Sequence, residues 1–146
     1  MTQYSATEGA WVALILPPNW CLFFFRDPRA EFTTARLKEC LLAEGLSVSG
    51  DEEPLRVRRK TDGPELFVSI HRGTVAETIA RGVVGKRRKH RKLIPGCDAH
   101  VKITFHDLDE VLDESNTLIQ VQWAVQAATR GLGYNSWNQA MWGPDD

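Results

Sequence analysis

The pattern of apolar and polar residues divides the chain into short strands and helices. Two segments near the start, 11–16 and 20–25, are continuously apolar, which is typical of strands buried on both faces. Pro17, Pro18 and Asn19 between them predict a turn. The pattern leaves open whether 20–25 is a second strand or continues the first strand beyond a kink.

Alternation of apolar and polar residues predicts three further strands. Segments 55–58 and 66–71 both alternate, and the turn 61–64 between them contains Gly63, which accepts a positive φ. We therefore expect an antiparallel hairpin. In segment 100–106 the odd-numbered residues are apolar and the even-numbered ones are polar, so that one face of this strand is buried.

Apolar residues at helical spacing predict three helices. Asp27 is a candidate N-cap and Pro28 a candidate first helical residue, so that one helix is expected over 28–44. A second helix is expected to begin at the capping box of Thr74 and Glu77, with Val75, Ile79 and Val83 as its buried stripe, and a third is expected over about 116–130.

The order of these elements is β(β)αββαβα, and its middle part, βαββαβ, is the order of ferredoxin-like split-βαβ folds. We therefore predict an α+β fold with a mostly antiparallel sheet, helices on one face and an added C-terminal helix. A chain of 146 residues is expected to form a single domain over 1–146, with 1–9 loose and 132–146 forming an aromatic tail. Many unrelated functions use this fold, so the fold indicates none of them.

Positive charge is concentrated in two places. The net charge is -1, yet segment 86–92 (the basic run) holds six Lys or Arg residues and segment 56–60 holds four. Acidic residues gather in 51–53 and 107–114. This balance excludes a globally basic nucleic-acid binder but leaves room for a local basic surface. We interpret 107–114 as a solvated acidic loop before the last helix.

The polar positions of the alternating strands define one face of the predicted sheet. Its members are Arg56, Arg58, Lys60, Phe67, Ser69, His71, His100, Lys102, Thr104 and His106. RNA-recognition modules stack bases on such a face, but the aromatic, glycine-rich strand signature of those modules is absent. The face is therefore either a binding surface or an ordinary solvated side of an antiparallel sheet.

The basic run offers a second candidate surface. Its cations are Lys86, Arg87, Arg88, Lys89, Arg91 and Lys92. Such a run can bind phosphates, an acidic protein or the acidic segment 107–114 of another copy, or it can be a solvated turn. No aromatic residue interrupts the run, so stacking of single-stranded bases within it is not expected.

In the aromatic tail, Trp137 and Trp142 either cap the core or form a docking patch.

Motifs of catalysis and of metal binding are absent from the sequence. There is no GxSxG, P-loop, GxGxxG or HExxH pattern. Cys97 and His100 can be drawn as a nucleophile and a base, but nothing in the sequence supplies an orienting group. His100 and His106 on one strand would lie about 20 Å apart, too far for one zinc site. We expect no metal and no cofactor.

These observations favour binding over catalysis. We expect a small non-catalytic protein that engages another protein through charged and aromatic patches, as an immunity or adaptor protein does. The alternative is a nucleic-acid-binding protein that uses 56–60, Arg59 included, together with the basic run; in that case the two basic segments should converge near an exposed Phe67. The third reading is an enzyme with an unrecognised site, in which a histidine meets a carboxylate or a thiol in a pocket.

Location and assembly follow from weaker signals. The three cysteines are widely spaced and form no CxxC pair, so we expect reduced thiols and a cytoplasmic protein. The apolar segment 11–25 is interrupted by prolines and is shorter than the about 20 residues of a spanning helix, so we expect no membrane partner. The sequence is compatible with a homo-oligomer and does not identify a partner.

Overall fold

The described strands pair into one antiparallel sheet. A computed structural model describes residues 19–73 and 75–146, with the backbone but not the side chain of Arg88. In this part of the chain the strands are β1 (Trp20–Phe25), β2 (Ser47–Ser49), β3 (Leu55–Arg58), β4 (Leu66–Arg72), β5 (Ala99–Thr104), β6 (Leu132–Asn135) and β7 (Met141–Trp142). Their order in the sheet is β2-β3-β4-β5-β1-β6-β7. The expected strand 11–16, the turn at Pro17 and Pro18, and the loose segment 1–9 lie outside the described residues.

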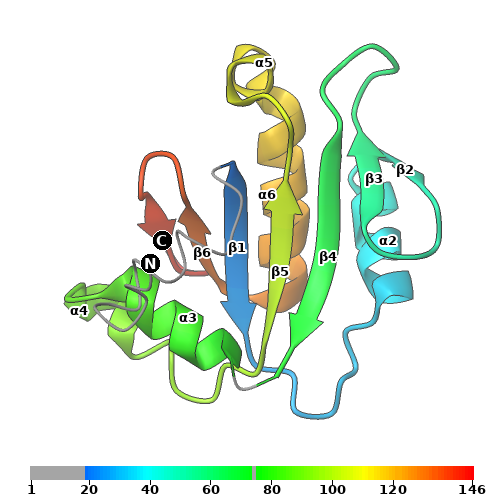
Figure 1. The fold of residues 1–146 in the computed structure, drawn as a ribbon. Helices are drawn as coiled ribbons and strands as arrows, with labels where there is room; N and C mark the ends of the chain where they lie inside the picture. Colours follow the sequence, from blue (N-terminus) through cyan, green and yellow to red (C-terminus); the bar gives the residue numbers. More distant parts are fainter. Residues whose placement is uncertain (1–18, 74) are drawn as a thin grey trace, which may run out of the picture.

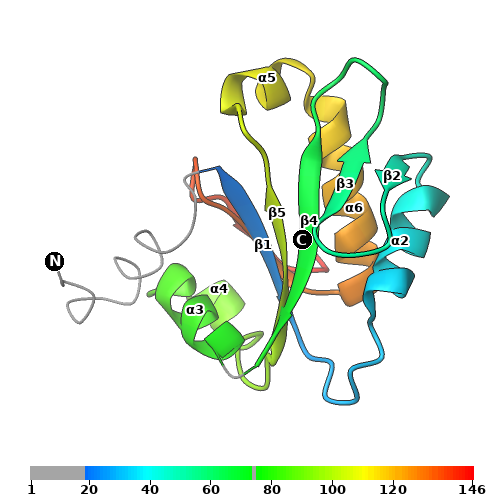
Figure 2. The same ribbon diagram turned by 45° about the vertical axis from the view of Figure 1, so that its right-hand side comes forward.

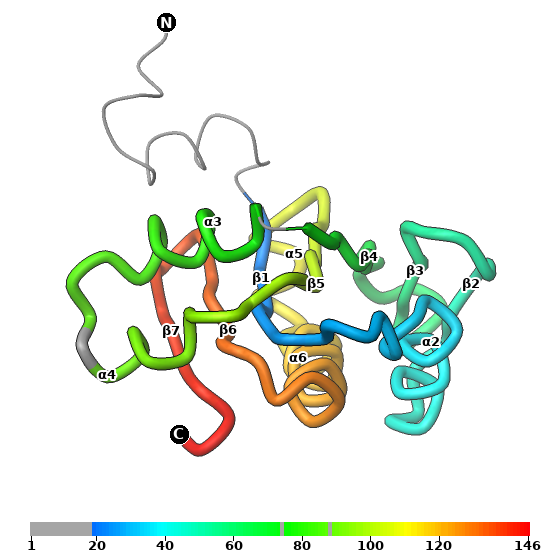
Figure 3. Tube along the Cα trace, turned by 90° about the horizontal axis from the view of Figure 1, so that it is seen from below, coloured from blue at the N-terminus to red at the C-terminus, as the bar shows by residue number. Residues whose placement is uncertain are grey.

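Helices cover both faces of this sheet. In the same part of the chain they are α2 (Thr34–Ala43), α3 (Val75–Val84), α4 (Arg88–Arg91), α5 (Leu108–Asp113) and α6 (Ser115–Thr129). Figures 1 and 2 show α2 and α6 on one side of the sheet and α3 with α4 on the other. The view from below separates α3 from α2 and α6 in the same way (Figure 3).

The central strand β1 is buried on both faces, which explains its continuous apolar sequence. Cys21, Phe23 and Phe25 belong to the core under α2 and α6. The alternate residues of the strand belong to a second core that includes Ile79 and Val84 of α3. Segment 20–25 therefore forms a strand, and its relation to the expected strand 11–16 lies outside the described residues.

The α+β class is confirmed, but the ferredoxin-like order is not. A split-βαβ unit joins parallel strands, whereas every pair of strands in the described sheet is antiparallel. The helices α3 and α4 connect β4 to β5, which are antiparallel neighbours with Arg72 opposite Ala99. The expectation of helices on one face was also wrong, because α3 packs on the face opposite to α2 and α6.

The first helix starts later than predicted because Asp27 has another role. Its carboxylate accepts hydrogen bonds from the backbone N–H groups of Glu31 (3.0 Å) and Phe32 (2.8 Å) and thereby shapes a loop. Helix α2 begins at Thr34, after Thr33, whose hydroxyl accepts the N–H of Arg36 at 3.2 Å.

Two charged segments that were read as loops contain short helices. Asp107 caps α5 by accepting the N–H groups of Asp109 and Glu110, so that the acidic segment 107–114 is helical rather than a solvated loop. The basic run contains α4. The hairpin, the helix that begins at Val75 and the last helix lie where the sequence predicts them.

Candidate functional site

The polar sheet face predicted from alternation is present on β3, β4 and β5. Phe67 of β4 lies opposite Thr104 of β5, and Ser69 lies opposite Lys102, all on the side of the sheet that also bears α3. Helix α3 packs over β1 and leaves this half of the face uncovered by any described helix (Figures 1 and 2). The strand register thus brings residues from two distant segments into one surface.

This open half of the face contains a cavity of about 530 Å³ (the sheet cavity). A volume of this size falls within the range of small-molecule sites. Its lining residues are Glu53, Pro54, Phe67, Ser69, His71, Lys102, Thr104 and His106. Glu53 and Pro54 are additions that the sequence did not indicate, because they belong to the loop between β2 and β3.

At one end of the sheet cavity, the lining residue His71 stacks on the buried His100. The rings of His71 and His100 are nearly parallel, 15° apart, with centroids 5.0 Å apart. His100 is only 4% exposed, so it supports His71 from within the sheet and is not the surface residue that alternation predicted. Burial, followed by His71 and Lys102, lowers the pKa of His100 to about 3.

His71 is held uncharged and hydrogen-bonded. Burial lowers the pKa of His71, and Lys102 lowers it further against the opposing effect of Glu53. Its Nε2 lies 2.9 Å from Oγ of Ser69. Glu53 does not hydrogen-bond to His71; its Oε2 instead accepts the N–H of Ile70 and the hydroxyl of Thr34. A serine–histidine pair is present, but a carboxylate that orients the histidine is not seen among the described residues.

The cysteine–histidine pair considered from the sequence does not form a nucleophilic site. The Cys97 thiol donates to the carbonyl oxygen of Leu93 at 3.2 Å. Burial raises the pKa of Cys97 to about 11, which leaves the sulfur protonated and a poor nucleophile at neutral pH.

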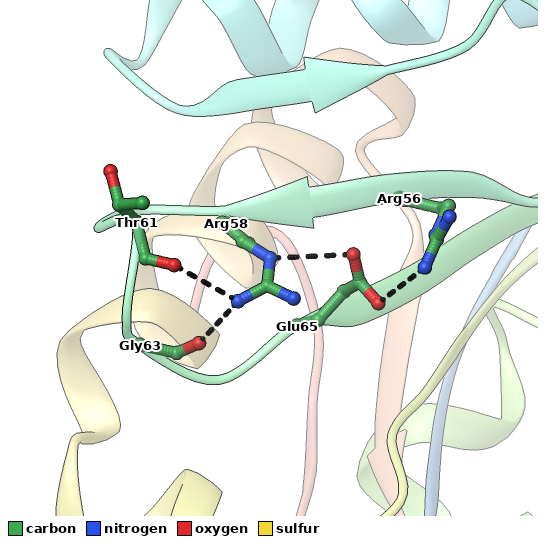
Figure 4. A network of polar contacts seen from close by, with 5 residues as sticks. All are labelled: Arg56, Arg58, Thr61, Gly63 and Glu65. Carbon is green, nitrogen blue, oxygen red and sulfur yellow. Dashed lines mark hydrogen bonds and ion pairs between the residues drawn. The ribbon is translucent and has the colours of Figure 1, made fainter.

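The cations of β3 hold the hairpin together. Arg56 and Arg58 both pair with the carboxylate of Glu65, at 3.2 and 3.3 Å (Figure 4). Nη1 of Arg58 also donates to the carbonyl oxygens of Thr61 and Gly63 across the turn. These contacts use most of the guanidinium donors of Arg58, whereas Lys60 is exposed beside the turn.

The basic run lies on the other side of the sheet centre, beside the β6–β7 end (Figure 1). Arg87 lies over the ring of Tyr134, 5.8 Å from its centroid. Lys89 pairs with Asp146 at 2.8 Å. The remaining exposed cations are Lys86, Arg91 and Lys92. The two basic segments therefore do not converge on Phe67, which was the geometry expected of a nucleic-acid interface.

The aromatic tail packs against the core. Trp137 makes an edge contact with Phe105, with ring centroids 5.6 Å apart, and Trp142 makes one with Phe23 at the same distance. Both indoles are half-buried. Their geometry is that of core-capping rings.

Helices α5 and α6 expose large apolar side chains that the sequence reading did not select, among them Trp123, which is the most exposed large apolar side chain of the described residues. Trp123 is 67% exposed, Leu112 46% and Ile119 37%. Helix α6 contains no Asp, Glu, Lys or Arg in its 15 residues. Leu118, Val121 and Val125 of α6 face the core, and the opposite face of the helix carries no charged residue. This pattern in the sequence could have indicated an exposed apolar surface.

Neither a metal centre among the described residues nor a match to a known protein assigns a function to the chain. In residues 19–73 and 75–146, no three His, Cys, Asp or Glu side chains are grouped as a metal site would require. No helix of the same residues is long and apolar enough to cross a membrane.

No family model, no curated protein and no solved structure matches the chain. Assignment of function rests on the geometry described above.

Proposed function

We propose that the protein is a non-catalytic binding module, in the manner of an immunity or adaptor protein, and that it docks another protein on the outer face of α5 and α6. Leu112, Ile119 and Trp123 (the helical patch) form the centre of this surface. The exposure of Trp123 is the observation that carries the proposal. Tryptophan is enriched among residues that dominate binding energy, because it removes a large rigid area from water.

The helical patch has the composition of an interface centre. Ile119 and Trp123 are four residues apart on α6 and therefore neighbours on its surface. Leu112 belongs to α5, which directly precedes α6 (Figure 1). The depletion of charge along α6 matches the depletion seen at the centres of protein interfaces.

The charges beside the patch indicate the chemistry of the partner. Asp109, Glu110 and Asp113 of α5 are exposed, and none forms an ion pair with a described residue. A partner that places an apolar pocket over Trp123 and Lys or Arg residues over α5 would satisfy both features. Such complementary charge mainly accelerates association and fixes orientation, while the buried indole supplies affinity.

A capture experiment with matched variants tests this proposal. Wild type, the Ile119→Ser/Trp123→Ser double variant and a Val75→Ser control are immobilised and exposed to lysate of the source organism. Val75 is a suitable control because it is 42% exposed on α3, on the other face of the sheet. A captured protein is then purified and titrated by calorimetry against each variant.

The expected result is a partner with a basic surface that binds wild type and Val75→Ser equally. The double variant should bind about 30-fold more weakly or worse. Changing Asp109, Glu110 and Asp113 to Asn should reduce the salt dependence of the association rate. Equal binding by all variants would overturn the proposal. A concentration-dependent dimer in light scattering that the double variant abolishes would instead assign the patch to a second copy.

A further inference from the structure

We propose that the sheet cavity is a binding site for a small planar organic anion, an aromatic ring that carries a carboxylate or a phosphate. The proposal is independent of the helical patch, because the sheet cavity lies on the opposite face of the sheet, among residues of β4 and β5. It assigns a ligand class to the polar face that the strand alternation defines.

The charged end of the ligand is indicated by Lys102. This side chain lines the sheet cavity, is half-buried, and forms no hydrogen bond or ion pair with any described residue. Two other cations of the same face, Arg56 and Arg58, are by contrast paired with Glu65 (Figure 4). Because this ammonium has no ion-pair partner among the described residues, its donors are available to bind an anion by charge-assisted hydrogen bonds.

Hydroxyl groups flank this cation on both strands. Ser69 is the direct cross-strand neighbour of Lys102, and Thr104 is two residues away on the same face of β5. Both line the sheet cavity. The Ser69 hydroxyl is engaged with His71, while Thr104 makes no hydrogen bond to a described residue through its side chain. The floor of the sheet cavity, formed by Lys102, Ser69 and Thr104, therefore offers a cation and hydroxyl donors. Such groups are suited to binding carboxylate or phosphate oxygens.

The planar part of the ligand is indicated by the rings at either end. His71 stacks one face on His100 and lines the sheet cavity, so a flat ligand can extend this stack. At the other end Phe67 and His106 form an edge-to-face pair with centroids 5.1 Å apart. Because burial and Lys102 lower the pKa of His71, its ring stays neutral at pH 7 and stacks without the desolvation cost of a charge.

One wall of the sheet cavity is built by the loop that precedes β3. The carboxylate of Glu53 accepts the N–H of Ile70 at 3.0 Å, at a point where β3 no longer pairs with β4. This bond anchors the loop and brings Pro54 to the edge of the cavity. The acidic Glu53 at this wall and the basic Lys102 on the floor fix one orientation, with the anionic group of the ligand directed to the floor.

The test is a heteronuclear NMR titration of the whole chain with four probes: phenyl phosphate, benzoate, the uncharged benzamide and inorganic phosphate. Phenyl phosphate or benzoate should shift the amide signals of Phe67, Ser69, His71 and Lys102 in a saturable manner, and benzamide should bind at least about tenfold more weakly. Lys102→Met keeps the length of the side chain and removes the charge, so it should weaken binding about tenfold or more. Lys92→Met removes an exposed cation from the basic run and should leave binding unchanged.

Three results would overturn the proposal. The first is the absence of saturable shifts with either anion. The second is equal weakening by Lys102→Met and Lys92→Met, which would mean that net charge alone attracts the probes. The third is an inorganic phosphate titration that matches phenyl phosphate in affinity, which would leave the rings without a role. The dispersion of the Lys102→Met spectrum shows whether that variant is folded.

Discussion

Nε2 of His90 lies 2.9 Å from one carboxylate oxygen of Asp146, and Nζ of Lys89 lies 2.8 Å from the other. One carboxylate thus ties residues 143–146 to the basic run. The hydrogen bond from Lys89, then those from the Gly143 N–H and His90, hold the pKa of Asp146 well below its usual range. The carboxylate is therefore ionised throughout the neutral range.

Replacing this carboxylate should loosen the basic run. In Asp146→Asn the charge that attracts Lys89 is lost, and we expect faster amide hydrogen exchange over residues 89–93 with little change elsewhere. Asp145→Asn is the matched control, since Asp145 pairs with Arg130 in an exposed contact and with no described side chain of the basic run. Equal exchange in both variants would contradict a restraining role for Asp146.

Asp27 should stabilise the protein in a pH-dependent manner. Burial raises the pKa of Asp27, but the N–H groups of Phe32 and Glu31 and the Arg72 guanidinium, 3.0 Å away, outweigh burial and lower it. Asp27→Asn should cost about 1–3 kcal/mol in the free energy of unfolding at pH 7.

The lowered pKa of Asp27 determines the pH range in which this residue stabilises the protein. Because the folded pKa is depressed, the stabilisation is complete above the unfolded pKa of about 3.9 and is lost as the pH falls through the folded value. Urea unfolding at pH 7 and near pH 3 should therefore show a difference between wild type and Asp27→Asn that shrinks in acid. If the difference in unfolding free energy between wild type and Asp27→Asn did not change with pH, the loss of stability would come from altered loop geometry and not from the lost charge.

His100 should make the protein acid-sensitive above the carboxylate range. Its folded pKa of about 3 lies below the unfolded value of about 6.5, so the unfolded chain binds the proton more tightly. Stability from this group is complete above pH 6.5 and falls by about 1.4 kcal/mol per pH unit on acidification toward pH 3.

The variant His100→Phe tests this acid sensitivity. It places an apolar ring between His71 and Phe24 and removes the buried Nδ1, which has no hydrogen-bond partner among the described residues. Between pH 7 and pH 5 its unfolding free energy should fall less than that of wild type, by about 2 kcal/mol. The exposed His106, changed to Phe, serves as control and should keep the wild-type slope. Parallel slopes for wild type and His100→Phe would refute the assignment.

The tryptophans should separate into structural and exposed classes. Trp142→Ala should destabilise the protein by about 2–3 kcal/mol, because its ring packs edge-on against Phe23 in the core. Gly133→Ala should disturb the same contact, since a Cβ at that position would lie 2.6 Å from the indole. Trp123→Ala should change stability by no more than about 0.5 kcal/mol. Chemical denaturation measures all three, and similar losses at Trp123 and Trp142 would contradict this division.

Local patterns predicted a large part of the fold. The side-chain period of a strand is two, so the sequence alone placed Phe67 and His71 on the face that the register with β5 now assigns to them. Helix α6 was located within one residue at each end because apolar spacing and the stop at Gly131 agree.

Contacts between residues that lie far apart in the sequence could not be predicted from local patterns. Asp27 has the sequence context of an N-cap but uses its carboxylate on loop amides and on Arg72, which is 45 residues away in the chain and adjacent only in the fold. The order of the strands depends on the β1–β5 and β1–β6 pairings, which no local pattern encodes. The burial of His100 between His71 and Phe24 follows from the β4–β5 and β1–β5 pairings.

The sheet cavity could be predicted only in part. Alternation placed Ser69, His71 and Lys102 on one face, but the loop wall of Glu53 and Pro54 depends on how β3 ends against β4. The helical patch was missed because a tryptophan at helical spacing is ordinarily read as a core residue. Only the burial of the opposite face shows that Trp123 points outward.

The outermost strands of the described sheet are very short: β2 has three residues and β7 has two. An outer strand exposes one row of amide and carbonyl groups, which is where extended segments of other chains attach and where aggregation begins. Strands of two or three residues present too few such groups to template a passing chain. The described fold thus discourages the addition of a strand at either of its two outermost strands.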